Sequence, residues 1–157
     1  MTRAVLPTSS KQRNPSDYFY FSTYSPRWSD NDVNLHLNNS VYGILFDTIT
    51  GIYFVEYQDE STMVATFLVD SHWHFFAPAA FPDMLDVGLR INKLGKSSLQ
   101  FEVAVFIHGH ESPTAVGYRT QVCIDMESQK SIGGPKRMRE GLQKLYRPLD
   151  MPPASKL

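Results

Sequence analysis

Four long segments in which apolar and polar residues alternate limit what this chain can fold into. They cover residues 62–75, 84–93, 98–108 and 115–126. Alternation places successive side chains on opposite faces of a strand, so each segment is typical of a half-buried strand. Residues 18–28 are aromatic and β-prone, and they add a first strand. The pattern predicts a largely antiparallel sheet of about five strands with one face in contact with water.

The alternation also assigns side chains to faces. In the segment 62–75 the predicted apolar face consists of Met63, Ala65, Phe67, Val69 and Trp73. In the segment 115–126 the apolar face consists of Val116, Tyr118, Val122, Ile124 and Met126. The opposite face of that last strand holds Arg119, Gln121 and Asp125. We therefore expect its polar face to lie toward water.

A different period appears between the first two strands. Residues 38–57 carry an apolar stripe at spacings of four and three, which is typical of a helix. The stripe consists of Leu37, Val41, Leu45, Thr48, Ile52 and Val55. Asn38 and Asn39 are expected to cap this helix. A second, shorter helix is expected to start at Gly134-Pro135, with Pro135 at its first position, and to run to about Lys144. The predicted fold class is α+β, with a sheet curled around a central helix.

Composition and charge argue against several classes of function. The chain has 157 residues, which is the size of one ordinary domain, and its formal charge of −1 offers no field that would attract nucleic acid. Cys123 is the only cysteine, so neither an internal disulfide nor a multi-cysteine metal site is expected. No apolar run approaches the roughly 20 residues that span a bilayer, and no membrane span is expected.

The two ends of the chain differ from the middle. Residues 1–16 are basic, contain two prolines and are expected to form a disordered leader before a domain over 17–147. Residues 148–157 are expected to form an extended tail that ends in Ser155-Lys156-Leu157. That tripeptide is read by the peroxisomal import receptor, so a peroxisomal location is expected, with the cytoplasm or the mitochondrion as alternatives.

The polar segment just before the central helix carries the candidate chemistry. The first turn of a helix has backbone N–H groups without partners and a partial positive charge, and both can stabilise the oxyanion of an acyl transfer. Asp32 precedes that turn, where its carboxylate could attack a carbonyl or activate water. The residues alone also allow a structural interpretation, in which Asp30 or Asp32 caps a turn and His36 packs.

The segment from Asp30 to Tyr42 resembles the signature of the 4-hydroxybenzoyl-CoA thioesterase family of the hotdog fold. That pattern runs acid, any residue, Asp, two residues, Gly, His, a hydrophobic residue, two Asn and then Tyr three positions on. Here it is DNDVNLHLNNSVY, with Leu35 in the place of the family's Gly. The likeness extends over roughly residues 18–145 and includes Gly95-Lys96-Ser97-Ser98, which resembles a turn between two strands of the family.

The resemblance implies an acyl-CoA thioesterase. Asp32 matches the catalytic nucleophile or general base, the backbone N–H of Asn39 matches the group that polarises the thioester carbonyl, and His36 belongs to the same motif. Lys96 and Ser97 match a turn that contacts the nucleotide end of coenzyme A, and Arg90 and Asn38 are further candidates for substrate binding. The family forms homodimers or homotetramers with sites at the subunit boundary, and it needs no metal or other cofactor.

Two other functions remain open at this stage. Hotdog-fold enoyl-CoA hydratases use an Asp and a His in a similar loop. The segment Asp32 to His36 resembles their motif, but it lacks the Pro of that motif and is one residue shorter. A non-catalytic acyl-CoA-binding protein would use the same cleft without turnover, and Leu35 is the feature that permits it. Because Leu does not tolerate all the backbone conformations of Gly, the path of this loop is the main question for the structure.

Overall fold

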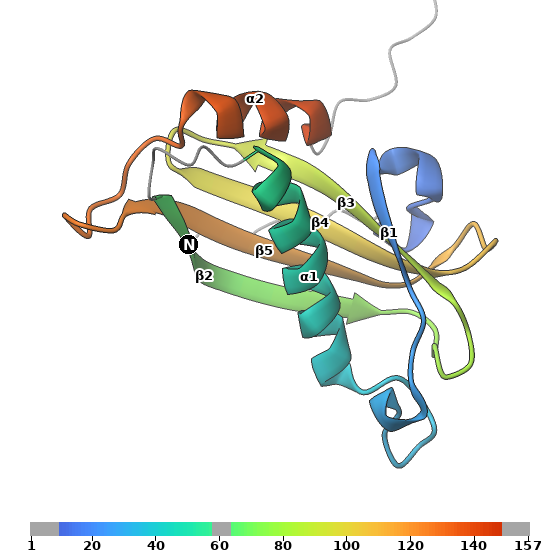
Figure 1. Cartoon of the computed structure of the whole chain (residues 1–157). Coiled ribbons are helices and arrows are strands. Elements are labelled where there is room, and N and C mark those ends of the chain that lie inside the picture. The colour runs from blue at the N-terminus through green and yellow to red at the C-terminus, as the bar shows by residue number, and fades with distance from the viewer. Residues whose placement is uncertain (1–9, 58–63, 149–157) are drawn as a thin grey trace, which may run out of the picture.

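The computed structural model of the chain describes residues 10–57 and 64–148, and its described strands form one antiparallel sheet (Figure 1). The order of the strands across the sheet is β1-β3-β4-β5-β2. The strands are β1 (Tyr20–Tyr24), β2 (Val64–Phe75), β3 (Leu85–Leu94), β4 (Ser98–Ile107) and β5 (Pro113–Asp125). The five predicted strands and their antiparallel pairing are confirmed, with β1 shorter than expected.

Helix α1 (Asn39–Tyr57) lies across one face of the sheet, as Figure 1 shows. Asn38 caps it as expected, since its side-chain oxygen accepts a hydrogen bond of 2.9 Å from the backbone N–H of Ser40. The first half of the predicted stripe is buried, whereas Thr48, Ile52 and Val55 are exposed. The helix instead buries Phe46, Ile49 and Tyr53, because periodicity alone does not specify the buried face of a helix that is apolar on most sides.

A β-bulge changes the predicted faces of β2. The pairing with β5 shifts between Leu68 and Asp70, and Val69 is the extra residue. Phe67 stands opposite Val122, but Trp73 stands opposite Gly117, on the other face of β5. The predicted single face of Met63, Ala65, Phe67, Val69 and Trp73 is therefore wrong after residue 68, and Met63 lies outside the described residues.

The predicted orientation of β5 is also wrong. Arg119 and Gln121 are buried on the side that faces α1, while Val116 and Tyr118 lie on the outer face. The Arg119 guanidinium lies 4.4 Å from the centre of the Phe46 ring and donates hydrogen bonds to the Asp47 carboxylate and to the Gly43 carbonyl oxygen. Alternation shows which residues share a face, but it does not show which face the helix covers.

The outer face of the sheet is covered by the N-terminal segment. Residues Ser10–Gln12 and Pro15–Asp17 form short 3-10 helices, and Arg13 donates hydrogen bonds to both oxygens of the fully buried Glu102 carboxylate, at 2.8 and 3.3 Å. The expected disordered leader over 1–16 is therefore wrong for residues 10–16, and residues 1–9 lie outside the described part. A buried carboxylate needs such a partner, and sequence patterns did not reveal that the partner comes from this segment.

Helix α2 (Lys136–Leu145) packs beside the C-terminal end of α1, where the Tyr53 hydroxyl donates a hydrogen bond of 2.7 Å to the Gly141 carbonyl oxygen. Pro135 is the N-cap residue and not the first helical residue, one position from the expectation. Over residues 10–57 and 64–148 no helix is both long and apolar enough to cross a bilayer. The expected tail and its Ser155-Lys156-Leu157 signal lie outside the described residues, apart from Pro148.

Candidate active site

A short hairpin-like loop leads from β1 into α1. Its two sides are joined by backbone hydrogen bonds from Asp32 N–H to the His36 oxygen, at 2.7 Å, and from Asn38 N–H to the Asp30 oxygen, at 2.8 Å. A third bond, from Leu37 N–H to the Ala79 oxygen at 2.7 Å, ties the loop to the segment that follows β2. These bonds fix the residues of the predicted motif in one place at the N-terminal end of α1.

Asp30 holds the base of this loop. Its buried carboxylate accepts hydrogen bonds from the Tyr24 hydroxyl at 2.6 Å and from the Arg27 backbone and side chain at 2.7 and 2.9 Å. The Arg27 guanidinium, helped by the Tyr24 hydroxyl, lowers the pKa of Asp30 to about 2. All its contacts are with neighbouring chain segments, so Asp30 has a structural role in the loop.

Asp32 is held differently. One carboxylate oxygen accepts hydrogen bonds from the backbone N–H groups of Asn34, at 2.8 Å, and of His36, at 3.3 Å. The Asn34 N–H, followed by that of His36, lowers the pKa of the Asp32 carboxyl below its ordinary value. The side chain is only partly buried and is ionised at neutral pH, as a nucleophile or a general base must be.

Asn39 is the first residue of α1, and its backbone N–H donates no hydrogen bond within the part of the chain that the structure describes. A helix start has no carbonyl to offer such an N–H, so the group remains available to a ligand. The helix dipole adds a partial positive charge at the same point. Asn39 and Asp32 both line the same pocket, which places a free donor and a carboxylate in one cavity.

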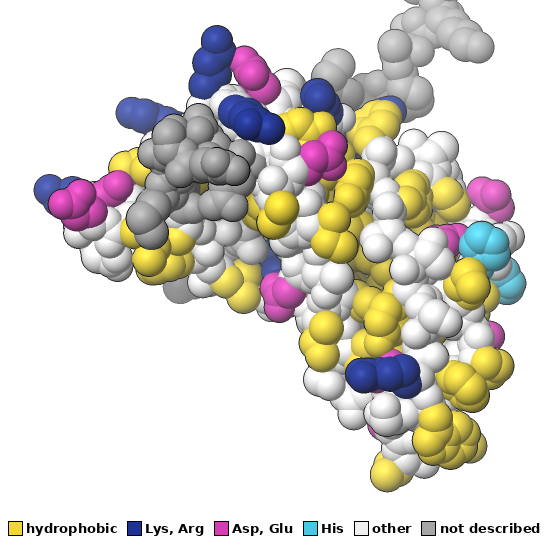
Figure 2. Space-filling model, viewed as in Figure 1, with side chains coloured by type: hydrophobic (Ala, Val, Ile, Leu, Met, Phe, Trp, Pro, Cys, Tyr) yellow, Lys and Arg dark blue, Asp and Glu magenta, His cyan; other side chains and the backbone are white. Residues whose placement is uncertain are grey.

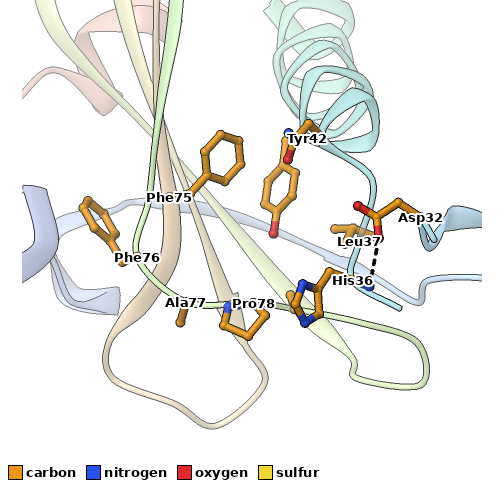
Figure 3. A pocket seen from close by; sticks show the side chains of 10 residues that line it. Asp32, His36, Leu37, Tyr42, Phe75, Phe76, Ala77 and Pro78 are labelled. Carbon is orange, nitrogen blue, oxygen red and sulfur yellow. Dashed lines mark hydrogen bonds between the residues drawn. The ribbon is translucent and has the colours of Figure 1, made fainter. Parts of the chain in front are cut away.

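That pocket has a volume of about 280 Å³ (Figure 3). One wall comes from the loop and from α1, with Asp32, His36, Leu37 and Tyr42. The other wall comes from the end of β2 and the residues after it, with Phe75, Phe76, Ala77, Pro78 and Ala79. The Tyr42 ring packs edge-on against Phe75 with the ring centres 5.0 Å apart, so the inner end of the pocket is aromatic.

Leu35 adopts a backbone conformation that favours glycine. Its φ of 61° lies in the left-handed region, and its side chain is exposed. A left-handed Leu costs roughly 1–2 kcal/mol relative to an ordinary conformation, and the backbone hydrogen bonds of the loop hold it there. The absence of Gly at this position does not displace Asp32 from the pocket.

The residues of the predicted motif lie in one wall of this pocket. Asp32, His36 and Asn39 lie together as expected, and Asn38 caps the helix beside them. The residues Ala77 to Ala79 were missed, because they carry no chemistry of their own. Pro78, just after the end of β2, is the signal that could have marked the place where the chain leaves the sheet.

The other predicted substrate-binding residues lie elsewhere. Lys96 and Ser97 form the turn between β3 and β4, near α2, whereas α2 contacts the opposite end of α1 from the pocket. Arg90 is buried and donates a hydrogen bond of 2.8 Å to the Arg147 carbonyl oxygen, which argues against the expected phosphate contact. Among the described residues no three His, Cys, Asp or Glu side chains are grouped so that they could hold a metal ion.

Comparisons with known proteins indicate the family and the fold of the chain. Residues 26–155 match the family model of the thioesterase-like superfamily. A search of curated proteins found no match to this sequence. Among solved structures, a protein from Pseudomonas aeruginosa is 34% identical, with a TM-score of 0.80 over 85% of this chain and 96% of that one.

Two more distant structures share the fold. A 1,4-dihydroxy-2-naphthoyl-CoA thioesterase from Synechocystis is 17% identical, with a TM-score of 0.71 over 80% of this chain and 96% of its own. A hypothetical protein from Staphylococcus aureus, solved in complex with CoA, is 14% identical, with a TM-score of 0.73 over 87% of this chain and 92% of its own. The matched family model covers most of the sequence, and the chain therefore belongs to the thioesterase-like superfamily and has a hotdog fold.

Proposed function

We propose that the protein is an acyl-CoA thioesterase that hydrolyses an acyl- or aryl-CoA thioester to the free acid and coenzyme A. The observation that carries this proposal is the free Asn39 N–H and the ionised Asp32 carboxylate in one pocket. A carbonyl needs a hydrogen-bond donor and a nucleophile or base on different sides, and these two groups supply both. Membership of the superfamily and the CoA bound to the Staphylococcus aureus protein support the choice of substrate.

In the proposed reaction the thioester carbonyl accepts a hydrogen bond from Asn39 N–H. The Asp32 carboxylate then attacks the carbonyl carbon, the C–S bond breaks, and coenzyme A leaves as its thiolate. Water hydrolyses the resulting mixed anhydride and regenerates Asp32. Alternatively, Asp32 takes a proton from a water molecule that attacks the carbonyl directly. In both versions the N–H stabilises the negative charge that develops on the carbonyl oxygen.

The shape of the pocket favours an apolar or aromatic acyl group. Tyr42 and Phe75 form its inner wall, and Trp73 lies behind Tyr42 with the ring centres 5.4 Å apart. Burial raises the pKa of the Tyr42 hydroxyl, so that hydroxyl stays neutral and can hydrogen-bond a substrate without adding charge. An aromatic wall with one neutral polar group suits an aryl or a branched acyl group.

We further propose that two copies form the active unit by pairing their β2 strands. β2 is an edge strand that is paired only with β5 in the described part of the chain, and its middle residues Phe67, Leu68 and Val69 are exposed. Helix α1 also exposes three apolar side chains, those of Ile44, Ile52 and Val55. An edge strand with exposed apolar side chains can pair with a second copy, because such pairing would supply partners for its free backbone N–H and C=O groups and bury those side chains.

Antiparallel pairing of β2 with its copy would also complete the site. The Phe75 end of β2 lines the pocket, and its Val64 end lies beside Asp125, at the end of β5 that contacts the Ser97 turn. An antiparallel partner brings its own Val64 end next to this pocket. The partner's Lys96-Ser97 turn would then face the Asp32 pocket, and coenzyme A would span both copies.

The test is a panel of acyl- and aryl-CoA thioesters assayed for release of free thiol. We expect thiol release by the wild type and a loss of about a hundredfold or more for Asp32→Asn. Asp17→Asn is a matched control, because Asp17 also accepts a backbone N–H in a turn but lies on the outer face. Loss of enoyl absorbance from crotonyl-CoA would favour a hydratase instead, and binding of acyl-CoA without thiol release would favour a non-catalytic protein.

A further inference from the structure

The His36 side chain faces the candidate pocket, and the protein does not engage its ring nitrogens. It lines the cavity together with Asp32, and in Figure 3 its ring points from the loop toward Pro78 on the opposite wall. Within residues 10–57 and 64–148 neither ring nitrogen takes part in a hydrogen bond, whereas the His36 backbone N–H donates one to Asp32. The backbone therefore fixes the position of His36, while the imidazole remains available to a ligand.

Attack by Asp32 on a thioester creates a leaving-group problem. The tetrahedral adduct carries the Asp32 carboxylate and the substrate sulfur on one carbon, and the weaker base leaves faster. An ordinary carboxyl has a pKa of about 4 and an ordinary alkyl thiol one of about 8.5, so the carboxylate is the weaker base by roughly ten-thousandfold. The Asn34 N–H lowers the pKa of Asp32 further and widens this gap. Unless the sulfur receives a proton, the adduct returns to the substrate.

Direct attack by water does not create this problem. Water has a pKa of about 15.7, so hydroxide is a much stronger base than a thiolate, and the adduct formed by water releases the thiolate without help. A need for an acid at the sulfur therefore separates the two versions of the proposed reaction. It is expected only where Asp32 is the nucleophile.

Among the residues that line the pocket, His36 is the one suited to supply that proton, because an imidazole can gain and lose a proton near neutral pH. Tyr42 is buried at the inner end, where burial raises the pKa of its hydroxyl and makes it a weaker acid. The Asn39 amide does not ionise. No Lys or Arg is among the described lining residues, and Figure 2 shows such side chains gathered over α2, at the other end of α1.

We propose that His36 is the general acid that protonates the sulfur of coenzyme A, and that Asp32 is the nucleophile. This inference rests on the proposed function. Asp32 bonds to the carbonyl carbon, the C–S bond breaks, and the sulfur takes a proton from the His36 imidazolium, so that coenzyme A leaves as a neutral thiol. The neutral imidazole then takes a proton from the water that attacks the acyl carbon of the mixed anhydride. This second step releases the carboxylic acid, frees the Asp32 carboxylate and restores the imidazolium.

The test compares two thioesters that share an acyl group and differ in the leaving group. One is an acyl-CoA, and the other is a 4-nitrothiophenyl ester, whose thiolate is a far weaker base and leaves without a proton. Single-turnover reactions with the protein in excess report only the cleavage of the C–S bond. For His36→Gln we expect thiol release to slow by about a hundredfold with the acyl-CoA. With the nitrothiophenyl ester the rate should stay within about threefold of the wild type.

His110→Gln is the matched control, because His110 is exposed between β4 and β5 and does not line the pocket, so both rates should be unchanged. Equal losses with both thioesters in His36→Gln would overturn the proposal in favour of a structural role. Unchanged rates with both would also overturn it, and would leave a thioesterase in which water attacks directly. Absence of thiol release by the wild type from every acyl-CoA would refute the proposed function, and the acid role of His36 with it.

Discussion

The loop before α1 and the outer face of the sheet each hold a carboxylate, but they treat it in opposite ways. In the loop, Asp32 receives two backbone N–H bonds and stays partly open to a cavity. On the outer face, Glu102 is completely buried and receives hydrogen bonds from Arg13, the Tyr18 hydroxyl at 2.7 Å and the Asn92 amide at 2.7 Å. The Asp32 carboxylate can still accept hydrogen bonds from a ligand, whereas the oxygens of Glu102 already accept theirs from protein side chains.

The comparison shows how to separate a reactive group from a structural one. A charged group on which protein side chains converge stabilises the fold, and its removal leaves the partner charges buried. A charged group that is held by backbone alone and faces a pocket can be exchanged with little effect on the fold. A neutral substitution of Asp32 should therefore lower turnover and leave stability nearly unchanged. A neutral substitution of Glu102 should lower stability and leave turnover nearly unchanged.

The largest expected effect is on turnover, in Asp32→Asn. An Asn side-chain oxygen can still accept the Asn34 N–H, so the loop keeps its path while the nucleophile or base is lost. We expect kcat for acyl-CoA hydrolysis to fall by about a hundredfold or more, with the free energy of unfolding changed by less than about 0.5 kcal/mol. Urea denaturation beside steady-state kinetics checks both values. A large drop in stability would remove the contrast with Glu102.

The next effect is on stability, in Glu102→Gln. This change leaves the Arg13 guanidinium half-buried and without its carboxylate, so we expect a loss of about 3 kcal/mol in the free energy of unfolding. The kcat of the folded variant should stay within about threefold of the wild type, because the cluster lies on the far side of the sheet from the pocket.

A double-mutant cycle sharpens this result. Arg13→Met combined with Glu102→Gln removes both charges, so the double variant should be more stable than the sum of the two single changes predicts. Strict additivity, measured by urea denaturation, would show that the two side chains do not act as a pair.

A smaller effect is expected on acid stability through Asp30. Its pKa in the folded protein is lowered to about 2, so its stabilising contribution is complete above its ordinary pKa and is lost as the pH falls toward 2. Because the Arg27 side chain is mostly exposed, solvent screening limits this contribution to about 1 kcal/mol. Asp30→Asn should therefore lower stability at pH 7 and give a shallower loss between about pH 5 and 2. Identical acid profiles in urea denaturation would contradict this assignment.

The smallest expected effect is a gain, in Leu35→Gly. Glycine adopts the left-handed conformation without steric cost, but it also gives the unfolded chain more freedom. The two terms nearly cancel, and we expect the free energy of unfolding to rise by about 0.5 kcal/mol with the Asp32 loop unchanged. Leu35→Ala keeps the strain and serves as the control. A destabilised Leu35→Gly variant would show that the exposed side chain contributes a packing contact.

The pattern of alternation predicted the positions of the four long strands well because apolar and polar residues alternate along most of each of them. It failed at Val69, where one extra residue reverses the faces of half a strand without any Gly or Pro to announce it. It also failed for Arg119, whose charge suggested solvent although the guanidinium lies against Phe46 beneath α1. Both errors concern the tertiary partner of a strand, which local periodicity does not encode.

The candidate site was predicted to the extent that it is local. Asp32, His36 and Asn39 fall within eight residues of one motif, so one loop brings them together. The position of the opposite wall depends on a contact between segments more than 35 residues apart, that of Leu37 with Ala79. No pattern within a single segment reveals such a contact.

The hydrogen bond from Leu37 N–H to the Ala79 oxygen spans the two walls of the pocket. It fixes the wall that holds the reactive groups against a second wall that contains Phe75, Ala77 and Pro78, which carry none. Side chains on the second wall can therefore change in size while the first wall keeps its geometry. Related chains could diverge in acyl preference through these few positions alone, and an engineer could exchange them without rebuilding the chemistry.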